Sequence, residues 1–159
     1  MMHNGGVVPY RERVRWPGWF LISLGFCLVA GYVVLGKSGA APTWAFVLAA
    51  LPFLLGAYAL WRMRFLDLEF GPAGIGYGFG RLTHRVPKER ILVAAAMDYP
   101  VARYMGWGYR LGWERGERAY SVLGFRRGVL VRFTDEEGRT RKVFLSSRTP
   151  EAAVAALEA

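Results

Sequence analysis

Two long apolar runs near the N-terminus constrain the fold more than any other feature of the sequence. Residues 17–36 and 38–61 contain no charged side chain, and only Lys37 lies between them. An α-helix rises about 1.5 Å per residue, so roughly 20 residues cross a hydrocarbon core of about 30 Å. Each run is therefore long enough to span a bilayer. The sequence predicts a two-helix membrane hairpin over residues 17–61, with spans at about 17–36 and 43–61.

Two other interpretations of these runs fit the sequence less well. A helical hairpin buried inside a soluble protein would need an apolar shell, which the rest of the chain cannot supply while it also buries a core of its own. The small residues Gly39, Ala40 and Ala41 suggest a signal-peptide cleavage site. However, the first run exceeds the usual signal core of about 7–15 residues and a second run follows at once. An uncleaved anchor is therefore the prediction.

Basic residues around the apolar runs give the predicted hairpin an orientation. Three arginines precede the first run, two follow the second, and the connecting loop carries one lysine. The positive-inside rule then places both termini in the cytoplasm, with residues 1–16 as an N-terminal arm. Aromatic side chains near both ends complete the set of expected membrane-interface anchors. These anchors are Arg11, Arg13, Arg15, Trp16, Trp19, Trp44, Trp61, Arg62 and Arg64.

The overall charge also favours a membrane protein over a nucleic-acid-binding one. Residues 1–64 hold six basic residues against one acidic residue, a net charge of +5, and residues 65–159 hold fifteen against eleven, a net charge of +4. The second part lacks the concentrated basic footprint of a nucleic-acid-binding protein. Arginine outnumbers lysine by eighteen to three, a bias expected from a GC-rich bacterial genome. We expect a multi-pass protein of the bacterial inner membrane that binds no nucleic acid.

From residue 65 the pattern changes to short strands. Three apolar residues between Phe65 and Phe70 alternate with Asp67 and Glu69, as in a half-buried strand. Thr149 and Pro150 suit the cap and first position of a C-terminal helix. The pattern predicts roughly seven strands and then one helix, an α+β arrangement. The expected strands cover residues 65–70, 75–86, 91–97, 105–113, 118–123, 129–133 and 139–146, with a turn at residues 135–138 between the last two.

The order of these elements carries a resemblance to a known family. The segments concerned are Gly106-Trp107-Gly108-Tyr109-Arg110, Ala119-Tyr120-Ser121-Val122, Gly124 to Val131, Arg141 to Ser147 and Pro150-Glu151-Ala152-Ala153. With them, residues 65–159 resemble the bacterial pleckstrin-homology-like (PH-like) domains, which often follow a pair of membrane helices. The resemblance implies a small PH-like β-sandwich or barrel closed by the C-terminal helix, on the cytoplasmic side.

The resemblance also bears on lipid recognition. Phosphoinositide-binding members of the wider family carry basic residues at the first turn between strands. The corresponding turn here, residues 71–74, has the sequence Gly-Pro-Ala-Gly and no basic side chain. Such a turn cannot supply the charge-assisted donors that a phosphorylated inositol needs. No specific phosphoinositide ligand is expected.

Candidate catalytic and cofactor-binding motifs are weak throughout the sequence. The glycine clusters at residues 76–80 and 106–112 lack the spacing and the following helix of a dinucleotide-binding fingerprint, so bends in strands are expected there. Cys27 is the only cysteine, and with two histidines it makes no metal site. His84 could pair with Ser121, Ser146 or Ser147 and with Asp67 or Asp98, but no nucleophile turn accompanies them. We expect no enzyme activity, cofactor or metal.

The densest basic groups are the predicted contact residues. They are Arg126, Arg127, Arg139, Arg141 and Lys142. At a membrane each such side chain contributes about 1 kcal/mol of attraction to anionic headgroups. The sequence thus predicts a non-catalytic, membrane-anchored PH-like binding or scaffolding module, with the lipid bilayer and a membrane protein or a second copy of itself as partners. The alternatives are an accessory subunit of a larger membrane complex, and a small membrane-bound hydrolase that uses His84 and Ser147.

Overall fold

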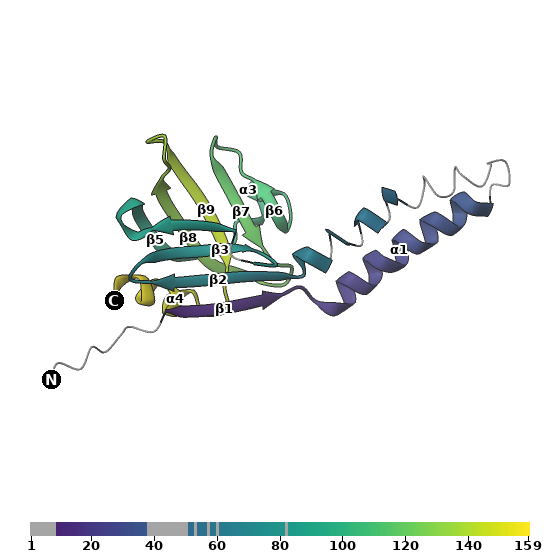
Figure 1. The fold of residues 1–159 in the computed structure, drawn as a ribbon, viewed down its shortest axis with the longest axis horizontal. Helices are drawn as coiled ribbons and strands as arrows, with labels where there is room; N and C mark the ends of the chain where they lie inside the picture. The colour runs from purple at the N-terminus through teal and green to yellow at the C-terminus, as the bar shows by residue number, and fades with distance from the viewer. Residues whose placement is uncertain (1–8, 38–50, 53, 57, 60, 82) are drawn as a thin grey trace. The chain divides into compact units, whose positions relative to one another are not determined.

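The computed structural model describes residues 9–37, 51–52, 54–56, 58–59, 61–81 and 83–159 (Figure 1). Its contacts divide the chain into two compact units. One unit is the segment Trp16–Arg64, and the other combines the residues before this segment with Phe65–Ala159. The smaller unit is thus inserted into the chain of the larger one.

The larger unit is built on two sheets. The first has the order β1-β2-β3-β4, with every neighbouring pair antiparallel. The second has the order β5-β8-β9-β7-β6, in which only the β7–β9 pair is parallel. The strands are β1 (Tyr10–Arg15), β2 (Phe65–Gly71), β3 (Gly74–Phe79), β4 (His84–Pro87), β5 (Ile91–Asp98), β6 (Gly108–Leu111), β7 (Glu117–Ser121), β8 (Arg127–Thr134) and β9 (Thr140–Ser146).

Three helical segments belong to the same unit. A single 3-10 turn, Lys88–Arg90, connects β4 to β5, and the short helix α3, Val101–Tyr104, follows β5. The C-terminal helix α4, Pro150–Glu158, begins at the Thr-Pro pair as predicted and packs against β2, β5 and β8. Figure 1 shows α4 at the end of the two sheets where β1 begins.

Buried apolar side chains fill the space between the sheets. β2 places alternate residues inward, as its sequence pattern predicts. An aromatic contact also joins the two sheets, because the rings of Tyr77 on β3 and Tyr120 on β7 lie 5.0 Å apart. The fully buried apolar residues of these strands include Val14, Leu66, Phe70, Val129, Val131 and Leu145.

A second apolar cluster lies on the other face of the five-stranded sheet. Phe144 pairs with Leu130 and Ala119, whereas its neighbour Leu145 pairs with residues of the inner face, so Phe144 points to the opposite side. The segment that contains α3 supplies Tyr99 and Tyr104, whose rings stack at 5.5 Å. Both faces of this sheet are therefore partly covered.

β1 is a strand that the sequence pattern did not reveal. Its sequence, Tyr-Arg-Glu-Arg-Val-Arg, is mostly charged and lacks the regular apolar residues of a typical half-buried strand. Its partner β2 follows only after the inserted segment. Arg13 donates to Asp67 at 2.5 Å and Arg11 donates to Glu69 at 2.8 Å, each across the strand pair. Both arginines, predicted as membrane-interface anchors, thus form cross-strand ion pairs with β2.

Glu12 joins β1 to the junction between β9 and α4. It lies on the inner side of β1, and its side chain is only 10% exposed. The Ser147 hydroxyl donates to its carboxylate at 2.6 Å, the backbone N–H of Arg148 at 2.9 Å and the Tyr10 hydroxyl at 2.8 Å. Tyr10 also contacts the Thr149 hydroxyl at 2.6 Å. One carboxylate therefore links the first strand to the last helix.

The structure contradicts the expected membrane hairpin. In the described part of the chain, no helix combines the length and the apolarity that crossing a membrane requires. The predicted hairpin at residues 17–61 and the multi-pass inner-membrane location are therefore wrong. The expected placement of both termini in the cytoplasm, which depended on that hairpin, loses its basis. Most of the second expected span, residues 43–61, lies outside the described residues.

The inserted unit contains one helix with defined bounds, α1, Gly18–Lys37. Several of its large apolar side chains are exposed, among them Ile22 and Phe26. At the base of the unit the backbone N–H of Trp16 donates to the carbonyl of Arg64 at 3.1 Å, which brings the two ends of the insertion together.

The expected closed sandwich or barrel of about seven strands is also wrong. The described residues form nine strands in two open sheets, and the fold is mainly β rather than α+β. One added strand is β1. The other arises because Gly80, with a φ of 75°, reverses the chain so that residues 84–87 pair back onto β3 instead of extending it.

We predict that Glu12→Ala destabilises the fold by about 1–3 kcal/mol, because it leaves buried donors without an acceptor. The matched control is Glu69→Ala on the neighbouring strand. Glu69 pairs with Arg11, whose side chain is 72% exposed, and an exposed ion pair contributes less than about 1 kcal/mol. Denaturant unfolding of both variants measures the difference. Equal losses would contradict the role assigned to Glu12.

Candidate binding surfaces

The basic residues predicted as a contact surface do not form one patch. Arg126 and Arg127 lie at the start of β8, and Arg139 lies in the turn at its far end. The register of the β8–β9 hairpin separates the two groups, since Gly128 pairs with Ser146 and Thr134 pairs with Thr140. The two basic groups of the sequence therefore remain separate in the tertiary structure.

Most of these basic side chains are already paired with carboxylates. Arg127 contacts Glu151, and Lys142 contacts Glu114. Arg139 and Arg141 share Asp135, with Arg141 at 2.8 Å. The Arg127–Glu151 pair is more than half exposed and contributes little, as is typical of a solvated strand surface, whereas the Arg141–Asp135 pair is partly buried.

The catalytic candidates are not brought together. His84 lies against the rings of Tyr77 and Tyr120, at 5.2 and 5.8 Å between centroids. Each candidate serine is engaged elsewhere: Ser121 with the Tyr99 hydroxyl, Ser146 with the amide of Val122, and Ser147 with Glu12. Among the described residues, no three histidine, cysteine or acidic side chains converge as metal ligands.

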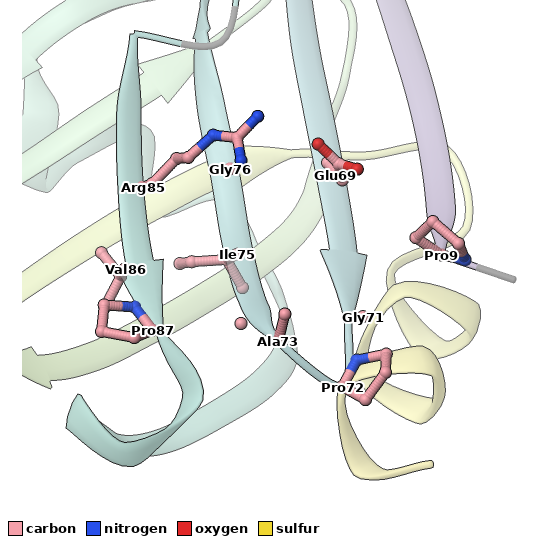
Figure 2. Close-up of a pocket in the computed structure, with 11 residues that line it drawn as sticks. Pro9, Glu69, Gly71, Pro72, Ala73, Ile75, Gly76, Arg85, Val86 and Pro87 are labelled. Carbon is pink, nitrogen blue, oxygen red and sulfur yellow. The ribbon is translucent and has the colours of Figure 1, made fainter. Parts of the chain in front are cut away.

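The glycines of β3 line the outer face of the first sheet. Figure 2 shows a pocket of about 390 Å³ there, in which Arg85 extends over Gly76 while Glu69 faces it from β2. Gly78 lies in extended backbone, and a Cβ atom there would meet the carbonyl of Arg81 at 2.4 Å. Close packing of the following turn therefore requires this glycine. The predicted bend is found at Gly80. Gly78 instead allows the following turn to pack closely against β3, and Gly76 forms part of the pocket floor.

The four edges of the two sheets differ in how they are protected. β1 carries alternating charges, β4 ends in Pro87, and β5 contains a bulge between Ile91 and Val93. Charges, proline and bulges are the usual means by which a protein prevents its edges from pairing with another chain. β6 has a single charged residue, Arg110, and carries two large apolar side chains, Tyr109 and Leu111.

The open edge of β6 presents backbone groups that are free to pair. The N–H of Gly112 donates to the carbonyl of Glu117 at 2.9 Å, which continues the register of the β6–β7 ladder. Antiparallel ladders alternate, so Arg110 directs its N–H and C=O toward β7 while Tyr109 and Leu111 direct theirs outward. In the described part of the chain, no other strand pairs with this edge.

Large exposed apolar side chains surround this edge. Leu111 is 67% exposed, Trp113 77% and Met105 78%. Such a concentration around a bare strand edge is typical of a protein contact site. The sequence places Trp107, Tyr109, Trp113 and Tyr120 in strands, where most are expected to be buried and an exposed subset would mark a partner surface. The structure identifies Trp113 and Tyr109 as exposed members of this set.

Comparison with known proteins found no matching family model, no matching curated protein and no matching solved structure. The resemblance to PH-like domains thus remains a prediction.

The Asp135 turn makes a pH-dependent contribution to stability. The backbone N–H of Arg139 donates to Asp135 at 2.8 Å and is the main cause that lowers the pKa of this carboxyl below its ordinary 3.8, with the Arg141 guanidinium adding to it. A lowered folded-state pKa contributes stability above the ordinary value, and that contribution is lost as pH falls through the folded-state pKa.

We therefore predict that Asp135→Asn is less stable than the wild type at pH 7 and that the difference shrinks below about pH 4. Urea unfolding across this pH range measures it. Glu136→Gln in the same turn is the control, because the Glu136 side chain is 86% exposed, and it should follow the wild-type curve. A difference that stays constant with pH would contradict the assignment.

Proposed function

We propose that this protein is a non-catalytic binding module that recruits another polypeptide through the β6 edge. The carrying observation is that β6 lacks the protection of the other three edges while exposing apolar side chains around outward-facing backbone groups. An extended peptide would add to the five-stranded sheet as a sixth strand. Backbone hydrogen bonds would supply affinity, and alternate side chains would supply specificity.

Charge complementarity indicates the sequence of the partner. Arg110 is exposed and donates only to the Trp107 carbonyl, at 3.0 Å, among the contacts of the described residues. The side chains of Tyr109 and Leu111 lie on the opposite face of β6 from Arg110. A partner strand that places an acidic residue opposite Arg110 and apolar residues opposite its neighbours fits both faces. We therefore propose an extended segment with an apolar-acidic-apolar pattern.

A second copy of this chain fits the edge less well. The register that uses the outward groups of both Tyr109 and Leu111 places Arg110 opposite the same arginine of the other copy. Like charges directly opposite each other on neighbouring strands are destabilising. An acidic partner removes this repulsion.

The non-catalytic part of the proposal is supported by the dispersed candidate residues. His84 is held among aromatic rings, and Ser147 is committed to Glu12. A hydrolytic site needs a nucleophile and a base within hydrogen-bond reach of each other. Neither of these side chains is placed for that chemistry.

Selection of a random linear-peptide library on the full chain tests the proposal. We expect the enriched peptides to share an acidic residue flanked at alternate positions by apolar ones. Leu111→Lys should lower the affinity for the selected peptide at least about tenfold, because it adds a charge to the apolar edge. Leu111→Pro should do the same, because it removes an outward N–H and leaves the bonds to β7 intact.

The matched control is Leu92→Lys on the opposite edge of the same sheet. Leu92 is 55% exposed, so the two lysine variants add the same charge at sites of similar exposure. Peptide binding should be unchanged in Leu92→Lys. Equal weakening by both variants would refute the proposal. So would a dimer in sedimentation analysis that Leu111→Lys dissociates, because a second copy would then occupy the edge.

A further inference from the structure

A second cleft, separate from the β6 edge, lies between the two sheets. It has a volume of about 410 Å³, which is within the range of small-molecule sites. One wall comes from Tyr77, His84 and Val86 on β3 and β4. The facing wall comes from the inner side of the second sheet, with Arg118 on β7 and Val143 on β9, and the ring of Phe133 lies beside them.

Arg118 is a charge of this cleft that has no carboxylate partner. It forms no ion pair within the part of the chain that the structure describes, and its side chain interacts with the Tyr120 hydroxyl on the same strand. The other inner-face arginine, Arg141, is held by Asp135 at 2.8 Å. Asp135 in turn accepts the backbone N–H groups of Glu137 and Arg139, so its oxygens are already engaged. The cleft therefore has a net positive charge carried by Arg118.

His84 and Tyr77 place further polar groups beside Arg118. Burial lowers the pKa of His84 and the charge of Arg118 lowers it further, so the imidazole is neutral at pH 7. Burial raises the pKa of the Tyr77 hydroxyl, which is therefore protonated and can donate. The rings of Tyr77 and His84 lie 5.2 Å apart, and Arg118 lines the same cleft.

We propose that this cleft binds a phosphate monoester carried on a small flat apolar body. Arg118 would hold the phosphate, and His84 and Tyr77 would donate to its remaining oxygens. A tetrahedral anion suits donors that approach from different sides, and a guanidinium matches phosphate geometry. The rings of Tyr77 and Phe133 and the side chain of Val143 would contact the flat body.

Phenyl phosphate is the probe, and the histidine NMR resonances are the readout. The chain has two histidines, His3 and His84, so His3 provides an internal reference. We expect phenyl phosphate to shift the His84 resonance saturably and to leave His3 unchanged. Inorganic phosphate should bind more weakly, because it lacks the apolar body. Phenol should not bind, because it lacks the anion.

Arg118→Gln should lower the affinity for phenyl phosphate at least about tenfold, since it removes a charge-assisted hydrogen-bond donor. The control is Arg132→Gln. Arg132 is exposed and pairs across the sheet with Lys142, on the face of the sheet opposite to the cleft. This control variant should bind as the wild type does. The far-ultraviolet circular dichroism of both variants verifies that they are folded.

A titration with benzenesulfonate isolates the contribution of His84 to the pH dependence of anion binding, because this probe does not itself titrate near neutrality. The groups that face His84 are Tyr77 on β3 and Arg118 and Tyr120 on β7, with the Arg141–Asp135 pair at the far wall. A bound anion favours the imidazolium, so the pKa of His84 should rise on binding. Affinity should therefore increase as pH falls toward 6.5, and His84→Gln should remove this increase.

Three results would overturn the proposal. The first is an unshifted His84 resonance at saturating phenyl phosphate. The second is equal weakening by Arg118→Gln and Arg132→Gln, which would indicate general attraction to a basic protein. The third is phenol binding as well as phenyl phosphate, which would indicate an apolar pocket without anion recognition. Each result is independent of the β6 edge and its peptide partner.

Discussion

The carboxylate of Glu12 is the interaction that most of the larger unit depends on. It fixes the β9–α4 junction to a strand that lies on the other side of a long inserted segment. Besides this link, β1 is held by its ladder to β2, by the buried side chain of Val14, by the contact of Tyr10 with Thr149 and by exposed ion pairs, which contribute little. Among these, the Glu12 carboxylate is the partly buried charge that joins the first strand to the junction of β9 and α4.

The open architecture explains where binding surfaces arise. Two sheets that are not closed leave four edges and a space between their diverging strands. Three edges carry charge, proline or a bulge, and the fourth, β6, remains available. The cleft beside His84 arises where the β8–β9 hairpin faces β4. Both sites thus follow from the same departure from a closed barrel.

Parts of the fold could be predicted from the sequence, but little of the candidate binding surfaces could. The alternation of Leu66, Leu68 and Phe70 gave β2, and Thr149-Pro150 gave the start of α4, because both signals are local. The sequence presents Arg126-Arg127 and Arg139-Arg141-Lys142 as two basic groups, and the structure keeps them apart because they lie at opposite ends of the eight-residue strand β8. Asp135 then binds Arg141, which removes it from any shared basic surface. The membrane hairpin was wrong, since none of the helices in the described part of the chain is long and apolar enough to cross a membrane.

The sequence alone determined the elements whose signals lie within a few residues: the strand alternation, the β8–β9 turn and the C-terminal helix cap. Tertiary structure alone decided which edges are exposed and which charges are free. β1 became a strand only through partners some fifty residues away, such as Asp67 and Glu69. Arg118 has no ion-pair partner among the described residues, while Asp135, which lines the same cleft, is paired with Arg141. Ion pairs and strand pairs between residues far apart in the sequence depend on the folded geometry. Local sequence patterns therefore do not predict them.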